Sequence, residues 1–286
     1  MIAVKTEKLR HVYSPQTPFE KVAVDDFSLE IEEGEFVGVI GHTGSGKSTF
    51  LQHLNGLMKP TSGKVFIHGR DMWADPKKIR EFRFMVGLVF QYPEYQLFEE
   101  TVEKDIAFGP TNMGLSAAEI SDRVRTAAEF VGLAPEVMQK SPFELSGGQK
   151  RRVAIAGIIA MRPEVLVLDE PAAGLDPRGR REILGGLLEY VKENDASIIL
   201  VSHSMEDMAY YCDNVVVMNK SEIYKSGTVD EIFSDADSLS EIGLDVPVVA
   251  KIASSLRKSG ISLTGELYTV DGVKDAIIRY IGGEKK

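Results

Sequence analysis

The amino-acid sequence predicts an α/β fold with a mostly parallel β-sheet at its centre. Short apolar segments rich in β-branched residues recur along the chain, which is typical of strands buried on both faces. Helical patterns separate these segments, and this alternation favours parallel strands joined by crossover helices. The segments that predict the strands are EFVGVIG (35–41), GLVFQ (87–91), EVLVLDEP (164–171) and SIILVSH (197–203).

Other segments complete the main domain. Residues 22–31 alternate between apolar and polar side chains, which predicts a half-buried strand, and residues 48–57 predict an amphipathic helix. Residues 101–139 have a largely helical pattern. Within them, Ser116 and Glu119 have the spacing of a capping box at a helix start.

The C-terminal part of the chain differs from the rest. Residues 214–227 predict a β-hairpin near the end of the main domain, and the composition changes from about residue 236. Residues 235–249 resemble a linker, and residues 270–283 predict a short amphipathic helix. We therefore expect a main domain over residues 1–235 and a small extension over residues 236–286.

Composition excludes several kinds of partner. The net charge is −10, which disfavours a nucleic-acid partner or direct adsorption to anionic lipid. Cys212 is the sole cysteine, so no internal disulfide is possible, which fits a reducing cytoplasm. The first 14 residues lack the apolar segment of a secretory signal, and no apolar run approaches the roughly 18 residues of a membrane span. Any membrane role is expected to come through a partner.

A glycine-rich loop, GHTGSGKST, stands between a predicted strand and a predicted helix. It matches the pattern G-x-x-x-x-G-K-[ST], and this strand–loop–helix context favours a phosphate-binding P-loop. Its glycines let the backbone wrap closely around phosphate oxygens, and the helix N-terminus adds positive potential. Lys47 would reach the β- and γ-phosphates, and Ser48 would bind Mg²⁺. The predicted ATP-binding residues of the loop are Gly41, His42, Thr43, Gly44, Ser45, Gly46, Lys47, Ser48 and Thr49.

Two carboxylates follow a predicted strand at the edge where open α/β sheets bind ligands. Asp169 could hold Mg²⁺ through a water molecule, and the adjacent Glu170 suits activation of the attacking water. His203 follows the next buried strand, so it emerges at the same edge and could bind the γ-phosphate. Together with Lys47 and Gln91, Glu170 and His203 are the candidate catalytic residues.

Gln91 and Tyr13 are candidates for the same site. Gln91 ends the predicted strand 87–91, where its amide could contact Mg²⁺ or the water and then move with the following loop. Tyr13 precedes the first clear strands, and its ring could stack on adenine. Each also has a plainer interpretation, Gln91 as a polar strand end and Tyr13 as a packed aromatic.

A second loop suited to phosphate, LSGGQ (145–149), raises a separate question. Ser146, Gly147 and Gly148 supply a hydroxyl and bare backbone amides at the start of a helix predicted over residues 150–161. Sequence spacing leaves open whether this loop folds back onto the P-loop of its own chain.

The order of these motifs resembles that of ABC-type ATPases over about residues 2–235. The resemblance rests on the P-loop, Gln91, LSGGQ, LVLDEP, AGLD (173–176) and His203. It implies a P-loop NTPase fold with an antiparallel β-subdomain and a helical subdomain at about residues 92–162. Ala172 departs from the threonine frequent in the family, at a position without a chemical role.

The same resemblance implies that two nucleotide-binding domains pack head to tail. Each ATP, with Mg²⁺ held by Ser48, Gln91 and Asp169, would then lie between the P-loop of one chain and LSGGQ of the other. Asp176 would lie at the dimer interface. The residues implied to contact the partner's ATP are Ser146, Gly147, Gly148 and Gln149.

A narrower resemblance is to the ATPases of energy-coupling factor (ECF) transporters, which import vitamins and transition-metal ions. It rests on PEYQLF (93–98) and AFGPTNMGL (107–115). It implies a peripheral subunit on the cytoplasmic face of the membrane, bound to a membrane scaffold (T component) that carries a substrate-binding subunit (S component). It also implies that the extension aids dimerisation. The residues implied to contact the scaffold are Tyr92, Glu94, Gln96 and Phe98, and the acidic Glu99 and Glu100 could pair with scaffold arginines.

Three alternatives remain open at this level. An ABC ATPase without a transport role would usually show two fused domains, a coiled-coil insertion or zinc-binding cysteines, none of which this sequence has. A P-loop kinase would need neither LSGGQ nor a glutamate followed by Pro171. An ABC transporter ATPase outside the ECF group would differ in the membrane subunits that co-purify with it. Homodimer and heterodimer are both compatible with the sequence.

Overall fold

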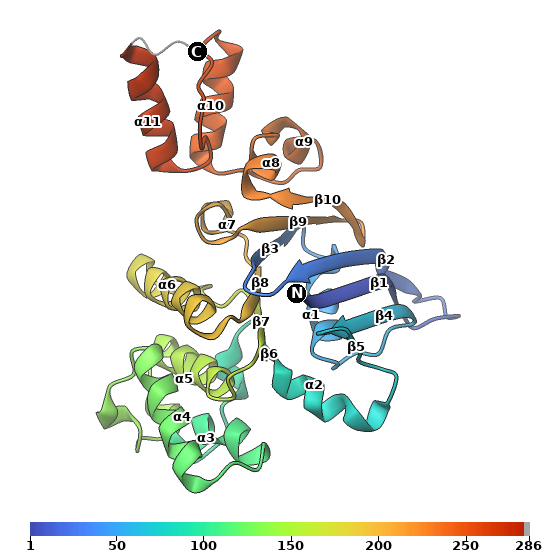
Figure 1. Cartoon of the computed structure of the whole chain (residues 1–286), viewed down its shortest axis with the longest axis vertical. Helices are drawn as coiled ribbons and strands as arrows, with labels where there is room; N and C mark the ends of the chain where they lie inside the picture. The colour runs from blue at the N-terminus through green and yellow to red at the C-terminus, as the bar shows by residue number, and fades with distance from the viewer. Residues whose placement is uncertain (283–286) are drawn as a thin grey trace.

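The computed structural model describes residues 1–282, in which the strands form two sheets (Figure 1). The larger sheet has the order β10-β9-β3-β8-β7-β6. Neighbouring strands from β9 to β6 are parallel, and β10 pairs antiparallel with β9. The predicted mostly parallel sheet and the C-terminal hairpin are therefore confirmed. Its strands are β3 (Phe36–Gly41), β6 (Val86–Val89), β7 (Val165–Asp169), β8 (Ser197–Val201), β9 (Asn214–Asn219) and β10 (Glu222–Thr228).

Helices surround this sheet and form a separate group beside it (Figure 1). The group comprising α3, α4 and α5 lies at the end of the molecule opposite α10 and α11. Short 3-10 turns η1 to η4 connect several elements. The helices are α1 (Lys47–Leu54), α2 (Ile79–Met85), α3 (Val102–Asn112), α4 (Ala117–Phe130), α5 (Gly147–Ile159), α6 (Pro177–Asn194), α7 (Met205–Tyr211), α8 (Val229–Phe233), α9 (Ala236–Glu241), α10 (Val248–Lys258) and α11 (Val270–Ile281), and the turns are η1 (Pro76–Lys78), η2 (Pro93–Gln96), η3 (Pro135–Val137) and η4 (Pro142–Glu144).

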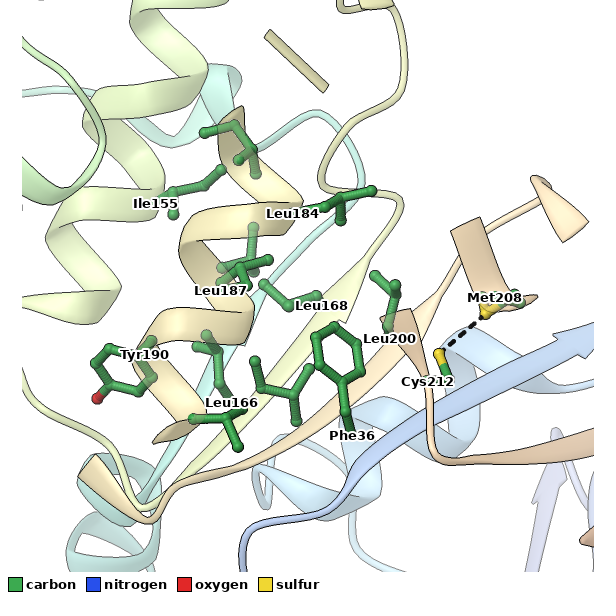
Figure 2. Close-up of a cluster of buried hydrophobic side chains, with 14 of the residues drawn as sticks. Phe36, Ile155, Leu166, Leu168, Leu184, Leu187, Tyr190, Leu200, Met208 and Cys212 are labelled. Atoms are coloured by element: carbon green, nitrogen blue, oxygen red, sulfur yellow. Dashed lines mark hydrogen bonds between the residues drawn. The ribbon is translucent and has the colours of Figure 1, made fainter. Parts of the chain in front are cut away.

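The central strands are buried on both faces, as their apolar sequences predict. Leu166 and Leu168 of β7 contact the cluster that includes Leu187 of α6, and Figure 2 shows these side chains together. The intervening Val165 and Val167 belong to a second cluster on the opposite face, which includes residues of α1. This alternation follows from the two-residue repeat of a strand. The sheet is thereby held between two apolar layers, and the strand ends that carry the polar residues are fixed.

The second sheet is antiparallel and has the order β2-β1-β4-β5. Phe27 of β2 packs against Phe50 of α1 with ring centroids 4.4 Å apart, so this sheet braces the helix that follows the P-loop. The alternation of residues 22–31 predicts β2, but no pattern in the sequence predicts β1, and Tyr13 is the last residue of β1 rather than a residue before the strands. The strands are β1 (Ile2–Tyr13), β2 (Lys21–Glu32), β4 (Ser62–Ile67) and β5 (Arg70–Asp71).

The helix start that the sequence predicts from its capping residues is present in the structure. The capping box at Ser116 and Glu119 is present at the start of α4. The predicted helical segment 101–139 is interrupted after Phe130, where the chain continues through the η3 turn. The strand predicted over residues 87–91 ends at Val89, so Gln91 lies in the loop beyond the strand.

The C-terminal residues form helices α9, α10 and α11, with α10 and α11 side by side at one end of the molecule (Figure 1). The linker predicted over residues 235–249 is wrong in part, because α9 occupies residues 236–241 and α10 begins at Val248. The helix predicted over residues 270–283 is confirmed to Ile281, and residue 283 lies outside the described residues. Within residues 1–282, no helix combines the length and apolarity needed to cross a bilayer.

Candidate functional site

A cleft of about 230 Å³ lies where strands β3, β7 and β8 end. The carboxyl ends of these parallel strands bring together the glycine-rich loop, the two acidic residues and the histidine singled out from the sequence. This is the edge at which open α/β sheets bind ligands. The residues that line the cleft are Tyr13, Lys21, Ala23, Thr43, Gly44, Gly46, Lys47, Ser48, Thr49, Gln91, Asp169, Glu170, Val201 and His203.

The loop before α1 needs glycine for steric reasons. Gly46 has φ of 104°, and a Cβ there would lie 2.0 Å from the Ala23 carbonyl oxygen. Gly46 is also the N-cap of α1 and supplies no side-chain cap, so the first backbone amides of the helix face the loop without a side-chain acceptor. These amides and the helix dipole make the loop a binding site for an anion such as phosphate.

Lys47 lies inside the loop rather than in solvent. Its Nζ donates hydrogen bonds to the carbonyl oxygens of Gly41 and His42, at 2.6 Å and 2.9 Å. Burial lowers the pKa of Lys47, and the nearby Asp169 and Glu170 carboxylates oppose that effect. The ammonium is therefore already positioned and partly desolvated, which strengthens its attraction for a phosphate oxygen.

Ser48 and Asp169 form a pair of oxygen ligands at the floor of the cleft. The Ser48 hydroxyl donates a hydrogen bond of 2.7 Å to Oδ2 of Asp169. Hydroxyl and carboxylate oxygens are the donors that Mg²⁺ prefers, with phosphate and water oxygens completing its octahedron. The two side chains therefore fit a Mg²⁺ ion that arrives with a nucleotide, and Gln91 lines the same cleft.

Glu170 has a constrained and desolvated position. Its φ is 54°, and its backbone amide donates a 3.0 Å hydrogen bond to the Val201 carbonyl. Burial, reinforced by the Asp169 charge, raises the pKa of Glu170 to about 7. Its buried Oε1 lies 3.5 Å from Nε2 of His203, which is too long for a good hydrogen bond. A carboxylate with this pKa is suited to accept a proton from water near neutral pH.

The LSGGQ residues lie outside this cleft, at the start of α5. The Ser146 hydroxyl accepts a hydrogen bond of 3.3 Å from the backbone amide of Gln149, and the side-chain Oε1 of Gln149 accepts one of 3.1 Å from the backbone amide of Ser146. A Cβ on Gly147 would meet no atom within 4 Å, so the start of this helix is open. Asp176 caps α6 in the same way, through a 2.6 Å hydrogen bond from Gly179.

A second, apolar groove of about 410 Å³ lies between α2, α3, α5 and the segment after η2. Phe98 and Phe108 line it with exposed rings that pack edge to face, 4.9 Å apart. Gln96 also lines the groove, whereas Tyr92 and Glu94 do not.

Two acidic residues expected to meet a partner instead have partners in this chain. The carboxylate of Glu94 binds the guanidinium of Arg151. The carboxylate of Glu100 lies 2.5 Å from Nζ of Lys104. The buried Glu94 carboxylate is therefore committed to Arg151, whereas the pair between Glu100 and Lys104 is exposed at the surface and weak.

Comparison with known proteins agrees with this geometry. The family model described as ABC transporter matches residues 24–173, and one described as AAA domain, putative AbiEii toxin, matches residues 140–208. The energy-coupling factor transporter ATP-binding protein EcfA2 of Clostridium perfringens (strain 13 / Type A) is 54% identical over 98% of this chain and 99% of its own length. The EcfA2 protein of Caldanaerobacter subterraneus subsp. tengcongensis is 52% identical over 99% of each chain. This chain belongs to the energy-coupling factor transporter ATP-binding proteins of the ABC transporter family.

Solved structures similar to this ECF ATP-binding protein share its fold. CbiO1 from Clostridium perfringens, part of the ABC transporter complex cbiONQ, superimposes with a TM-score of 0.75 at 37% identity, over 88% of this chain and 99% of that one. The ATP-binding cassette MJ0796, a dimer in a post-hydrolysis state bound to ADP and Pi, gives a TM-score of 0.72 at 27% identity, over 79% of this chain and 98% of that one. The predicted ABC ATPase fold is therefore confirmed.

Most residues that sequence analysis assigned to the nucleotide site of this ECF ATP-binding protein do line the cleft. Gly41, His42 and Ser45 do not line the cleft, although the carbonyl oxygens of Gly41 and His42 accept hydrogen bonds from Nζ of Lys47. Tyr13 lines the cleft near Thr49, with which its hydroxyl shares a 3.1 Å hydrogen bond. The predicted signature residues Ser146, Gly147, Gly148 and Gln149 lie elsewhere.

Lys21, Ala23 and Val201 also line the cleft and are not predicted from the sequence. Neither is a contact between the P-loop and the C-terminal extension, in which Nε2 of His42 donates a hydrogen bond to the Ile242 carbonyl at 2.5 Å. No local sequence pattern identifies these residues, since strand pairing or the packing of the extension brings them to the site.

Proposed function

We propose that this ECF ATP-binding protein hydrolyses ATP·Mg²⁺ in the cleft and thereby powers an importer. The observation that carries the proposal is the joint placement of the P-loop lysine, the Ser48–Asp169 oxygen pair and the desolvated Glu170. Lys47 would contact the β- and γ-phosphates, and Glu170 would accept the proton of the attacking water. His203 would bind the γ-phosphate, and Tyr13 would stack on the adenine ring.

Mg²⁺ would be held by Ser48, Asp169 and Gln91, and when bound it neutralises charge on the phosphate oxygens. The other roles belong to residues of the chain. Lys47 and the loop amides orient the nucleotide, and Gln91 links the site to the loop that carries η2. The buried position of Glu170 keeps its carboxylate oriented toward the cleft.

The working unit would be a dimer of ATP-binding subunits, either identical or related. Ser146 caps a 13-residue helix through its bonds to Gln149, and the backbone amides of Gly147 and Gly148 are open at the helix start, but none of the three residues lines the cleft of its own chain. A helix start of this kind favours a phosphate. We propose that it contacts ATP bound by the second subunit, with Gln149 beside it and Asp176 at the interface. The similar cassette MJ0796 is a dimer bound to ADP and Pi, which supports a dimeric working unit.

Residues 236–286 would form a dimerisation extension attached to the nucleotide-binding domain of residues 1–235. Helices α10 and α11 expose several large apolar side chains, which an unpartnered surface would rarely leave in water. Covering them with a second subunit would remove this area from water. The exposed side chains are Val248, Ile252, Val270, Ile278 and Ile281.

The membrane partners would be a scaffold (T component) and a substrate-binding subunit (S component), with this chain on the cytoplasmic face. The apolar groove lined by Phe98, Phe108 and Gln96 is suited to a helix of the scaffold, and Tyr92, which lies outside the groove, would be a further contact. The transported molecule, a vitamin or a transition-metal ion, would bind the substrate-binding subunit and never touch this chain.

The test is co-purification combined with a Glu170→Gln variant of the full chain. We expect wild-type protein to hydrolyse ATP and to co-purify with a polytopic scaffold and a small membrane substrate binder. The variant should bind ATP, accumulate as a dimer on a sizing column and hydrolyse ATP at least about 100-fold more slowly. Hydrolysis by the variant at the wild-type rate would contradict the role of Glu170. Co-purification of a periplasmic-type binding protein would contradict the ECF assignment.

A further inference from the structure

Arg151 and Glu94 form a buried, bidentate ion pair that the nucleotide chemistry does not use. Nη2 of Arg151 lies 2.9 Å from Oε1 and 3.1 Å from Oε2 of Glu94, and Nε lies 3.1 Å from Oε2. The Arg151 side chain is 4% exposed and that of Glu94 is 17% exposed. Breaking a pair of this kind leaves an uncompensated buried charge, which is strongly unfavourable. The pair therefore holds its two elements in a fixed relation.

The two elements it joins have different functions. Glu94 lies in η2, three residues after Gln91, which lines the nucleotide cleft. Arg151 lies in α5, four residues after Gly147, so the two residues are about one helical turn apart. The ion pair thus connects the loop of this chain's own cleft to the helix that begins with the signature residues.

The rest of the loop is also fixed to the helical group. The backbone amides of Phe98 and Glu99 donate hydrogen bonds of 3.3 Å and 3.2 Å to the carboxylate of Asp105 in α3. The Asp105 side chain is buried, so this anchor is shielded from water. The segment from Glu94 to Glu99 is therefore attached to α5 at one end and to α3 at the other.

The chain turns sharply between this segment and the cleft. Tyr92 caps η2 with φ of 58°, an unfavourable conformation for a bulky residue. Its side chain is half exposed, so the surrounding structure packs against it only in part. Only Tyr92 and Pro93 separate Gln91 from Glu94, so a displacement of Gln91 would reach Glu94 and pass through Arg151 to α5.

We infer that Glu94 and Arg151 are positioning residues, which set the signature residues of α5 according to the position of the loop that carries Gln91. This inference rests on the proposed dimer, in which the signature completes the site of the second subunit. It also changes the role of Glu94. Its carboxylate binds Arg151, and the apolar groove with Phe98 and Phe108 is the surface that would contact the membrane partner.

The test compares kcat and KM for ATP in the full-length chain. Glu94→Gln should lower kcat about 10- to 100-fold, since displacements near 1 Å are sufficient for such losses. KM should change less than about threefold, because the P-loop that binds the chain's own ATP is untouched. Amide hydrogen exchange at residues 146–149 should become faster. The charge-exchanged variant Glu94→Arg with Arg151→Glu should recover kcat to within about threefold of wild type.

A matched control uses the next residue of the same helix. Arg152 pairs with Glu182 of α6 at 2.7 Å, so Glu182→Gln removes an ion pair from α5 without touching η2. It should leave kcat within about twofold of wild type. If Glu94→Gln fails to fold, Arg151→Lys replaces it, because lysine keeps the charge and loses the bidentate geometry. Arg151→Lys should lower kcat with KM preserved.

Outcomes that contradict the inference differ from those that contradict the proposed function. Wild-type kcat in Glu94→Gln, equal loss in Glu182→Gln, or no recovery in the exchanged variant would each overturn the positioning role. Absence of ATP hydrolysis by the wild-type chain would overturn the proposed function instead.

Discussion

Replacing Glu170 by glutamine should make the nucleotide-free chain more stable at alkaline pH. Burial raises the pKa of this carboxyl from 4.5 to about 7, so folding favours its protonated form. The unfolded chain loses this proton near pH 4.5 and the folded chain near pH 7. The folded state therefore loses stability as the pH rises between these values, and the whole cost, about 3 kcal/mol, is present above pH 7.

Glutamine removes this cost because it is neutral at every pH. The variant should exceed wild type by about 3 kcal/mol at pH 8, or about 6 °C in Tm for a chain of this size. At pH 5 the difference should fall below about 1 kcal/mol. Thermal unfolding at both pH values, with EDTA and without nucleotide, measures it.

The control for this experiment is Glu182→Gln. Hydrogen bonds from Arg152 and Arg178 lower the pKa of Glu182, so its removal should not stabilise the chain at pH 8. An equal difference in Tm between Glu170→Gln and wild type at pH 5 and pH 8 would refute the reasoning.

Three further predictions concern the cleft and the extension. Gly46→Ala should reduce binding of a fluorescent ATP analogue at least about 100-fold, because the new Cβ would lie 2.0 Å from the Ala23 carbonyl and the residue has φ of 104°; binding within threefold of wild type would contradict the steric requirement. Asp169→Asn should lower ATP hydrolysis at least about 100-fold while nucleotide binding in EDTA stays near wild type, because it removes the carboxylate that Ser48 contacts; an equal loss of nucleotide binding with and without Mg²⁺ would argue against Asp169 as a metal ligand. Ile278→Glu should raise the dissociation constant of the dimer at least about tenfold in analytical ultracentrifugation, because Ile278 is 58% exposed on α11; an unchanged constant would place the interface elsewhere.

The sequence was most informative where function depends on local backbone geometry. The P-loop needs glycine at Gly41 and Gly46, where a Cβ would collide with neighbouring backbone, and favours it at Gly44, where φ is 83°, so its pattern is visible in a single chain. Buried parallel strands are apolar throughout, and the residues that follow them fall at one edge of the sheet. Asp169, Glu170 and His203 could therefore be assigned to one site from their positions in the sequence.

Strand β1 and the exact end of β6 could not be predicted from local sequence patterns. Strand β1 pairs with β2 and β4 through registers that contain several shifts, so its side chains lack a clean two-residue alternation. Gln91 was placed at a strand end, but β6 stops at Val89 because pairing with β7 ends there. Element boundaries depend on partners, which a local pattern does not contain.

By itself, the sequence determined that this protein has a P-loop, an acidic pair at the end of a buried strand, and a second glycine-rich helix start. Only the tertiary structure decided that the second start lies outside the cleft of its own chain, and that Arg151 holds Glu94 across 57 residues. It also decided that His42 contacts Ile242, 200 residues away. Backbone conformation is set by neighbouring residues, whereas contacts between distant residues exist only once helices and sheets have packed together.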